Sequence, residues 1–204
     1  MNALETLPNR FFSLALMLPT QPQPWAVDVR KARKGDAQAF ANLVKSVQRQ
    51  VYGLSLRLLR TEAEASEIAQ EAFLRAYQNL ESFDETRPFD LWVLAIARNL
   101  CLDVLRRRTK MKTEDVEDHA HSIASVESNA EDRSIAAQER LSLEAAMNTL
   151  SVDDREVLAL YYVQKRTTRE IAEVLSVAPG TIMARLFRAR EKLRSRMAQN
   201  EAPV

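Results

Sequence analysis

The chain has little glycine and almost no cysteine. Three glycines among 204 residues leave few positions for tight turns with positive φ, glycine-rich phosphate loops or β-hairpins. The one cysteine, Cys101, excludes an internal disulfide and a zinc site built from cysteine clusters. The fold therefore has to be held by packing alone. Together with abundant alanine, leucine, glutamate and arginine, this predicts an all-α protein.

Long hydrophobic runs are also absent. The longest, Phe11 to Leu18, is far shorter than the roughly 20 residues that a helix needs to cross a bilayer, so we expect no membrane span. Prolines follow this run instead of a small-residue cleavage site, which disfavours a secretory signal peptide. We treat residues 1–26 as a leader without an assigned role and expect a cytoplasmic protein.

Neither sign of charge dominates the whole chain, whose formal net charge of +1 predicts no strong general attraction to polyanions. The charges are nevertheless segregated. Residues 98–112 carry a net charge of +5 and residues 165–196 one of +6, whereas residues 113–132 contain seven acidic residues and no lysine or arginine. Two basic segments on either side of an acidic one are typical of a protein that binds nucleic acid at two places. The alternative is that these lysines and arginines compensate helix dipoles, but this would explain only the basic residues in the last turn of a helix.

Hydrophobic residues spaced by three and four predict three long helices in the first half of the chain, after Asp36, after Thr61 and from Phe89 to Leu105. Asp36 is a predicted N-cap, and Thr61 with Glu64 has the form of a capping box. We expect a compact helical bundle over residues 27–109.

A flexible, self-repelling acidic linker is predicted over residues 110–135, followed by a second helical domain over residues 136–198 and a tail over residues 199–204. Thr167 with Glu170 forms another capping-box pattern, which opens a short helix. A brief turn separates this helix from the last one, which starts near Pro179. The pattern indicates a helix-turn-helix, with a plain helical hairpin as the alternative.

The outward face of the last helix is suited to duplex DNA. Ile182, Leu186 and Ala189 point inward by their spacing, which leaves the outward positions to Thr181, Ala184, Arg185, Phe187 and Arg188. Thr181 and the helix N-terminal amides are placed to bind phosphate. Arg188 suits a guanine edge, and Phe187 or Ala184 suits a thymine methyl group.

Aromatic and basic side chains also gather at the third helix and the loop before it. The candidates are Ser82, Phe83, Arg87, Trp92, Arg98, Asn99, Asp103 and Arg106. Unstacked bases need an aromatic face and a neutralised backbone, so this group favours single-stranded nucleic acid. A lone helical tryptophan, however, is more often a core residue. The preceding helix presents four polar residues, either as a solvated face or as an acidic docking surface for a basic partner: Glu64, Glu67, Gln70 and Glu71.

Three segments of this chain resemble regions 2.2, 2.4 and 4.2 of bacterial extracytoplasmic-function sigma factors, which belong to the primary-sigma superfamily. They cover residues 64–83, 89–108 and 169–194, within a resemblance that runs from about Val27 to Met197. The motifs E-I-A-Q-E-A-F-L-R, W-x-x-x-I-A-R-N and G-T-[IV]-x-x-R-L-x-R-A-R occur in the family's order and spacing.

The resemblance implies a two-domain initiation factor that joins core RNA polymerase and chooses promoters. By that similarity, the clamp helices of the largest polymerase subunit would bind Glu67, Gln70, Glu71 and Leu74. The candidates at the third helix and the loop before it would open the minus-ten promoter element and hold an extruded base. The outward face of the last helix would read the minus-35 element. The family also implies an anti-sigma factor as a partner, and no enzymatic activity, cofactor, metal or small-molecule substrate.

This chain departs from the family pattern at three positions. Ser176 replaces a usual turn glycine, Met183 replaces a common basic residue, and Asp90 lies where a basic residue is frequent. We interpret these differences as altered promoter preference.

Two other functions compete with this prediction. One is a helix-turn-helix operator-binding regulator whose first bundle serves dimerisation or sensing. The other is a metal enzyme that uses His119 and His121, which we disfavour because these residues lie in the predicted linker without supporting contacts. Cys101 is expected to be a small buried hydrophobic residue.

Overall fold

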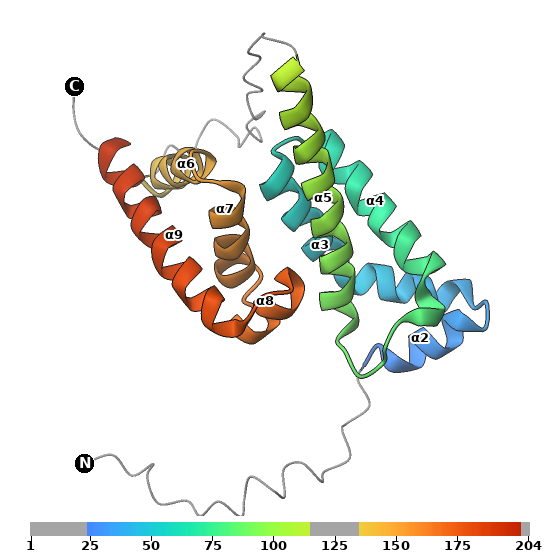
Figure 1. Ribbon diagram of the computed structural model, residues 1–204. Helices are drawn as coiled ribbons and strands as arrows, with labels where there is room; N and C mark the ends of the chain where they lie inside the picture. Colours follow the sequence, from blue (N-terminus) through green and yellow to red (C-terminus); the bar gives the residue numbers. More distant parts are fainter. Residues whose placement is uncertain (1–23, 115–134, 201–204) are drawn as a thin grey trace, which may run out of the picture.

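The computed structural model describes residues 24–114 and 135–200, and within these ranges it contains helices and no strand (Figure 1). The all-α expectation, with two helical units, is therefore confirmed. The leader, the acidic linker with His119 and His121, and most of the tail fall outside the described residues. In the described part, no helix is long and apolar enough to cross a membrane.

The first unit consists of α2 (Ala26–Arg33), α3 (Ala37–Leu59), α4 (Glu62–Gln78), a short 3-10 turn η1 (Leu80–Ser82) and α5 (Phe89–Glu114). Helices α3, α4 and α5 pack against one another, and α2 packs against α3. The predicted apolar stripe of α3 is buried, with Leu43, Val51, Leu54 and Leu58 almost inaccessible to solvent.

Two local features of this unit differ from the sequence prediction. Helix α2 was not predicted, because its buried residues Val29 and Ala32 leave little periodic signal in eight residues. The prediction of a capping box at Thr61 is also wrong. The Thr61 hydroxyl donates to the Glu64 carboxylate and does not accept the backbone hydrogen bond that a capping box requires. Glu64 is drawn toward α5, where it forms an ion pair with Arg108. The Asp36 cap, by contrast, is confirmed, because its Oδ1 accepts a hydrogen bond from the Ala39 amide at 3.0 Å.

The second unit consists of α6 (Ile135–Asn148), α7 (Val152–Leu158), a π-helical turn η2 (Ala159–Val163), α8 (Thr168–Leu175) and α9 (Pro179–Asn200). Helix α9 contacts α6, α7 and α8, so it forms the long wall of this unit. The Ser151 hydroxyl accepts a hydrogen bond from the Asp154 amide and caps the start of α7.

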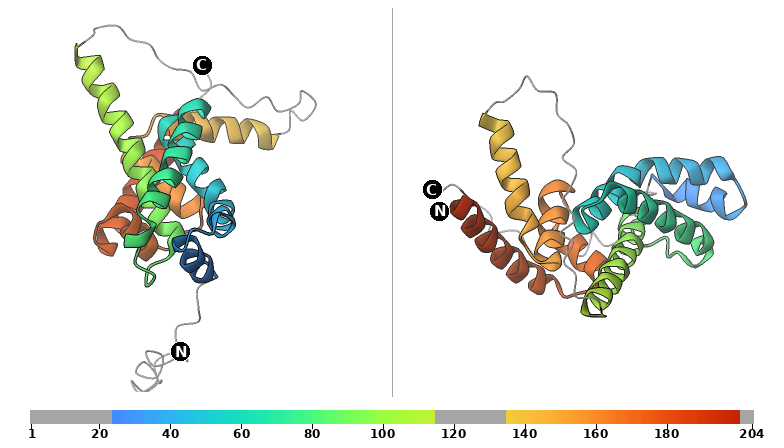
Figure 2. Two further views of the ribbon diagram at one scale, coloured as in Figure 1. Left: turned by 90° about the vertical axis from the view of Figure 1, so that its right-hand side faces the viewer. Right: turned by 90° about the horizontal axis from the view of Figure 1, so that it is seen from above.

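The two units lie against each other (Figures 1 and 2). Helix α5 contacts α8, and α3 contacts α7 and η2. Buried hydrophobic side chains of both units belong to one contiguous cluster, which extends from Leu54 and Leu94 to Leu160 and Ile171. The relative position of the two units therefore decides which of their surfaces are open to solvent.

Candidate nucleic-acid interface

A helix-turn-helix is formed by α8, the turn at Ser176 and α9. The capping box at Thr167 is complete: its hydroxyl accepts from the Glu170 amide, and the Glu170 carboxylate accepts from the Thr167 amide. After α8, Ser176 adopts φ 54° and ψ 44°, and the Val177 amide donates to the Ala172 carbonyl at 3.0 Å. This left-handed helix ending usually takes glycine, so the backbone is strained at Ser176.

Helix α9 buries one face and exposes the other, as its spacing predicts. Ile182, Leu186 and Ala189 are buried. The candidates Thr181, Ala184, Phe187 and Arg188 are exposed and Arg185 is half-buried. Phe187 keeps 65% of its surface in solvent, which is unusual for a large aromatic side chain and leaves its ring free for contact with a partner. The Arg188 Nε donates to the Ala184 carbonyl at 3.3 Å, and the side chain lies on the surface of the helix.

Contacts behind α9 hold this helix in place. Lys192 Nζ lies 2.6 Å from Asp154 Oδ2 on α7. Burial alone would raise the pKa of Asp154, but its hydrogen bonds from Lys192 and Ser151 bring the pKa below the ordinary value. The Arg190 guanidinium lies 5.3 Å and 5.4 Å from the ring centroids of Tyr161 and Tyr162, within cation–π range. The outward face of α9 is thus presented by a rigid support.

The aromatic candidates of the first unit form a cluster beneath the loop before α5. Phe83 and Trp92 lie 4.7 Å apart between ring centroids, and Phe89 lies 5.6 Å from Phe83. Phe83 is buried and Trp92 is half-buried, so Phe83 supports the loop and Trp92 has part of its ring accessible. Of the polar candidates, Ser82, Asn99, Asp103 and Arg106 are exposed; Arg106 lies 3.1 Å from Asp103 on the same helix.

The remaining basic candidates of the first unit are paired with carboxylates of the second. Arg98 Nε lies 2.6 Å from Glu156 Oε1, with 15% of the Arg98 side chain and none of the Glu156 side chain exposed. Burial raises the pKa of Glu156, and the hydrogen bonds and charge of Arg98 oppose that rise. Arg87 Nε lies 2.8 Å from Glu173 Oε1 near the surface. Sequence reasoning missed both partners, because no local pattern links residues that are 58 and 86 positions apart.

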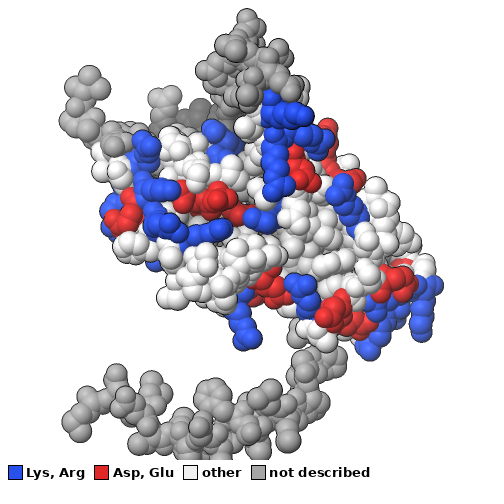
Figure 3. All heavy atoms as spheres, viewed as in Figure 1, with Lys and Arg blue, Asp and Glu red and all other residues white. Residues whose placement is uncertain are grey.

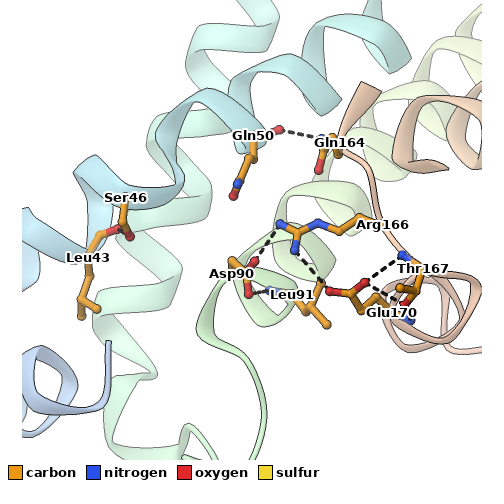
Figure 4. A network of polar contacts seen from close by, with 9 residues as sticks. All are labelled: Leu43, Ser46, Gln50, Asp90, Leu91, Gln164, Arg166, Thr167 and Glu170. Atoms are coloured by element: carbon orange, nitrogen blue, oxygen red, sulfur yellow. Dashed lines mark hydrogen bonds and ion pairs between the residues drawn. The ribbon is translucent and has the colours of Figure 1, made fainter. Parts of the chain in front are cut away.

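A third set of polar contacts joins the start of α5 to the start of α8 (Figure 4). Arg166 lies between Asp90, at 2.7 Å, and Glu170, at 3.5 Å. Close by, the Gln164 Nε2 donates to the Gln50 carbonyl at 2.9 Å. The acidic residue at position 90 therefore has a structural partner in the other unit.

The candidate docking residues lie on α4. Glu67, Gln70 and Leu74 are exposed, with 51% of Leu74 in solvent, and Glu71 is half-buried. Glu71 Oε1 accepts from Arg75 Nε at 2.7 Å. An acidic face with an exposed leucine fits a partner that is basic around an apolar centre.

Figure 3 shows lysine and arginine side chains along α9 and along the upper part of α5, with acidic side chains between them. The described residues contain no group of three potential ligands among histidine, cysteine, aspartate and glutamate that could hold a metal ion. Cys101 is fully buried, and this burial raises the pKa of its thiol to about 11. It is therefore a packed core residue, as expected.

Comparisons with known proteins agree with this geometry. Residues 43–111 match the family described as sigma-70 region 2, and residues 140–193 match sigma-70 region 4. Over 176 residues, 32% are identical to the ECF RNA polymerase sigma factor SigW of Bacillus subtilis, a match that covers 83% of this chain and 94% of the relative. The chain belongs to the extracytoplasmic-function sigma factors of the sigma-70 superfamily.

A second relative of this sigma factor supports the same assignment, and a solved structure shows the same fold. The RNA polymerase sigma-H factor of Pseudomonas aeruginosa is 30% identical over 174 residues, which cover 81% of this chain and 89% of the relative. Among solved structures, the sigma factor RpoE in complex with the anti-sigma factor NepR from Bartonella quintana matches with a TM-score of 0.67 and 22% identity. That match covers 81% of this chain and all of the other. The protein is an alternative sigma factor for transcription initiation.

Proposed function

We propose that this sigma factor divides promoter recognition between its two units, with the outward face of α9 reading the minus-35 element as duplex. The observation that carries this proposal is the pattern of exposure on α9. Thr181 and Ala184 lie in its first two turns, followed by Phe187 and Arg188, all of them exposed, while the opposite face is buried. A helix held in this way fits the major groove, where arginine binds guanine edges and an apolar group contacts the thymine methyl.

In the first unit, the opened minus-ten element contacts the half-buried Trp92 together with Ser82, Arg87, Arg98, Asn99, Asp103 and Arg106. The aromatic ring stacks on an unpaired nucleobase, and the arginine side chains of α5 neutralise the phosphate charges of the strand. The buried Phe83 holds this loop in shape through its contact with Trp92. Trp92 is therefore assigned to base stacking and Phe83 to support of the loop, because Trp92 is half-buried and Phe83 is buried.

The acidic face of α4 binds core RNA polymerase. Glu67, Gln70, Glu71 and Leu74 form this face, and the proposed partner is the pair of clamp helices in the largest polymerase subunit. A sigma factor that acts on polymerase works in the cytoplasm and catalyses no reaction itself. One similar structure contains a sigma factor bound to an anti-sigma factor, and we propose that a protein of this class also binds this chain.

Run-off transcription tests the proposed function directly. Purified bacterial core polymerase is assayed with and without the protein on genomic fragments, including the region upstream of its own gene. Discrete start sites that need the protein are expected, and they define the promoter. Failure to bind core polymerase, together with tight duplex binding, would instead favour the operator-binding regulator.

Substitution of Arg188 by alanine tests the base-reading role. We expect a loss of about 1–3 kcal/mol in binding to the mapped promoter and relaxed specificity at one base position. The measurement is a scan of single base-pair changes across the minus-35 element. An equal loss on every sequence would show that Arg188 contacts only the backbone.

A further inference from the structure

Helix α9 exposes two large hydrophobic side chains, one turn apart, on its outward side. Met183 keeps 66% of its surface in solvent and Phe187 keeps 65%. Residues four positions apart lie on the same side of a helix, with their Cβ atoms about 5–6 Å from each other. Single exposed hydrophobic residues are normal on a protein surface, whereas adjoining ones mark contact sites. We call these two side chains the apolar stripe of α9.

The apolar stripe forms one edge of the outward face. A helix turns by about 100° per residue, which places Thr181 and Arg188 at the opposite edge of that face. Gly180 and Ala184 lie between the two edges; both are exposed, and Gly180 faces open space. Residues this small let the backbone of the helix approach the base edges of a duplex closely. The outward face therefore has a polar edge and an apolar edge on either side of a shallow centre.

The charge around the apolar stripe indicates what covers it. Residues 179–190 contain three arginines and no acidic residue. Of these arginines, Arg188 is exposed, and Arg185 and Arg190 are half-buried. A basic surface with an apolar stripe fits a polyanion that carries apolar groups of its own. The major groove of duplex DNA is such a ligand, because the C5 methyl group of thymine points into it between the two phosphate backbones.

The spacing of the apolar stripe fits neighbouring base pairs. Adjacent base pairs are separated by about 3.4 Å along the duplex, and the two side chains start about 5–6 Å apart on α9. Met183 has three rotatable side-chain bonds, so its thioether end adapts to the position of a methyl group. Neither side chain carries a hydrogen-bonding group suited to guanine or adenine edges, so what they distinguish is the presence of a methyl group.

We propose that Met183, together with Phe187, binds the C5 methyl groups of pyrimidines in two neighbouring base pairs of the minus-35 element. Met183 is thereby a further specificity-determining residue of this sigma factor. The inference rests on the proposed reading of the minus-35 duplex by α9, and it names the chemical group that the apolar edge reads. Because 5-methylcytosine carries the same methyl group as thymine, the stripe accepts either base.

Uracil tests this directly, because it differs from thymine only in lacking the methyl group. The minus-35 element mapped by run-off transcription is prepared as a duplex in which each thymine is replaced in turn by uracil. A second set of duplexes compares cytosine with 5-methylcytosine at the same positions. Fluorescence anisotropy measures the affinity of the full chain and of its variants Met183→Ala and Phe187→Ala. Met111→Ala is the matched control, because Met111 lies on α5 and is 65% exposed.

We expect the unaltered chain to lose affinity about four-fold for each of two neighbouring methyl groups that is removed, as expected for the burial of one methyl group. Met183→Ala should abolish this loss at one position and Phe187→Ala at the neighbouring one, whereas Met111→Ala keeps both. At the same positions, 5-methylcytosine should bind about four-fold more tightly than cytosine, except in the variant that lacks the corresponding side chain. All three substitutions are at exposed positions, so the variants should fold.

The results that would overturn the inference differ from those that would overturn the proposed function. If uracil has no effect, or 5-methylcytosine no advantage, while single base-pair changes still weaken binding, α9 reads the duplex but not its methyl groups. If base-pair changes have no effect either, the proposed reading of the minus-35 element by α9 fails as well. If Met183→Ala senses both methyl groups as the unaltered chain does, Met183 is not a reader. A loss of core polymerase binding in that variant would then assign the apolar stripe to a protein partner.

Discussion

Replacement of Ser176 by glycine should stabilise this sigma factor. Ser176 ends α8 with φ 54°, in the left-handed region, and its side chain is exposed. Its amide donates to the Glu173 carbonyl at 3.2 Å, and the next amide donates to Ala172. Glycine keeps both backbone hydrogen bonds and removes the Cβ that makes this conformation costly.

The expected gain follows from two opposing contributions. A residue other than glycine loses about 1–2 kcal/mol in the left-handed region. Glycine also gives the unfolded chain more freedom, which lowers the free energy of unfolding by about 0.4–1 kcal/mol. We therefore expect Ser176→Gly to raise this free energy by about 0.5–1 kcal/mol, or the melting temperature by about 1–4 °C for a chain of this length.

Urea unfolding followed by circular dichroism measures this change. Ser195→Gly is the matched control, because the same substitution at an exposed position within α9 should lower stability by about 0.5–1 kcal/mol. Affinity for the minus-35 duplex should stay the same in Ser176→Gly, since the turn keeps its backbone angles. A loss of stability in both variants would refute the strain argument.

Two further predictions concern single carboxylates. Glu71→Lys should weaken binding to core polymerase and leave duplex affinity unchanged; Glu62→Lys, on another side of α4, is the charge control in a polymerase pull-down. For Glu170, burial alone would raise the pKa, but hydrogen bonds from Thr167 and the charge of Arg166 lower it below the ordinary 4.5. Ionised Glu170 therefore stabilises the folded protein above about pH 4.5, and this contribution is lost as the pH falls through the pKa that Glu170 has in the folded state. Glu170→Gln should flatten this part of the acid-unfolding curve, whereas an unchanged curve would mean that Glu170 contributes nothing there.

Much of the fold follows from the sequence because helices are specified by local patterns. The apolar spacing in α3 and α9, the Asp36 cap and the capping box at Thr167 all involve residues a few positions apart, and each was found where it was predicted. The outward face of α9 follows from the same periodicity. The failed capping box at Thr61 shows the limit of local rules, because Arg108, 44 positions away from Glu64, competes for the glutamate.

Only the tertiary structure decided which of the charged residues are available. Arg98 and Glu156 look like surface residues of two separate helices until α7 packs on the first unit and the pair becomes buried. Asp90 looks like an odd acidic residue in a basic surface until Arg166 lies beside it. A sequence determines its helices through residues one to four positions apart. Ion pairs between the two units depend instead on how the folded helices pack, and the periodicity of the sequence does not encode this packing.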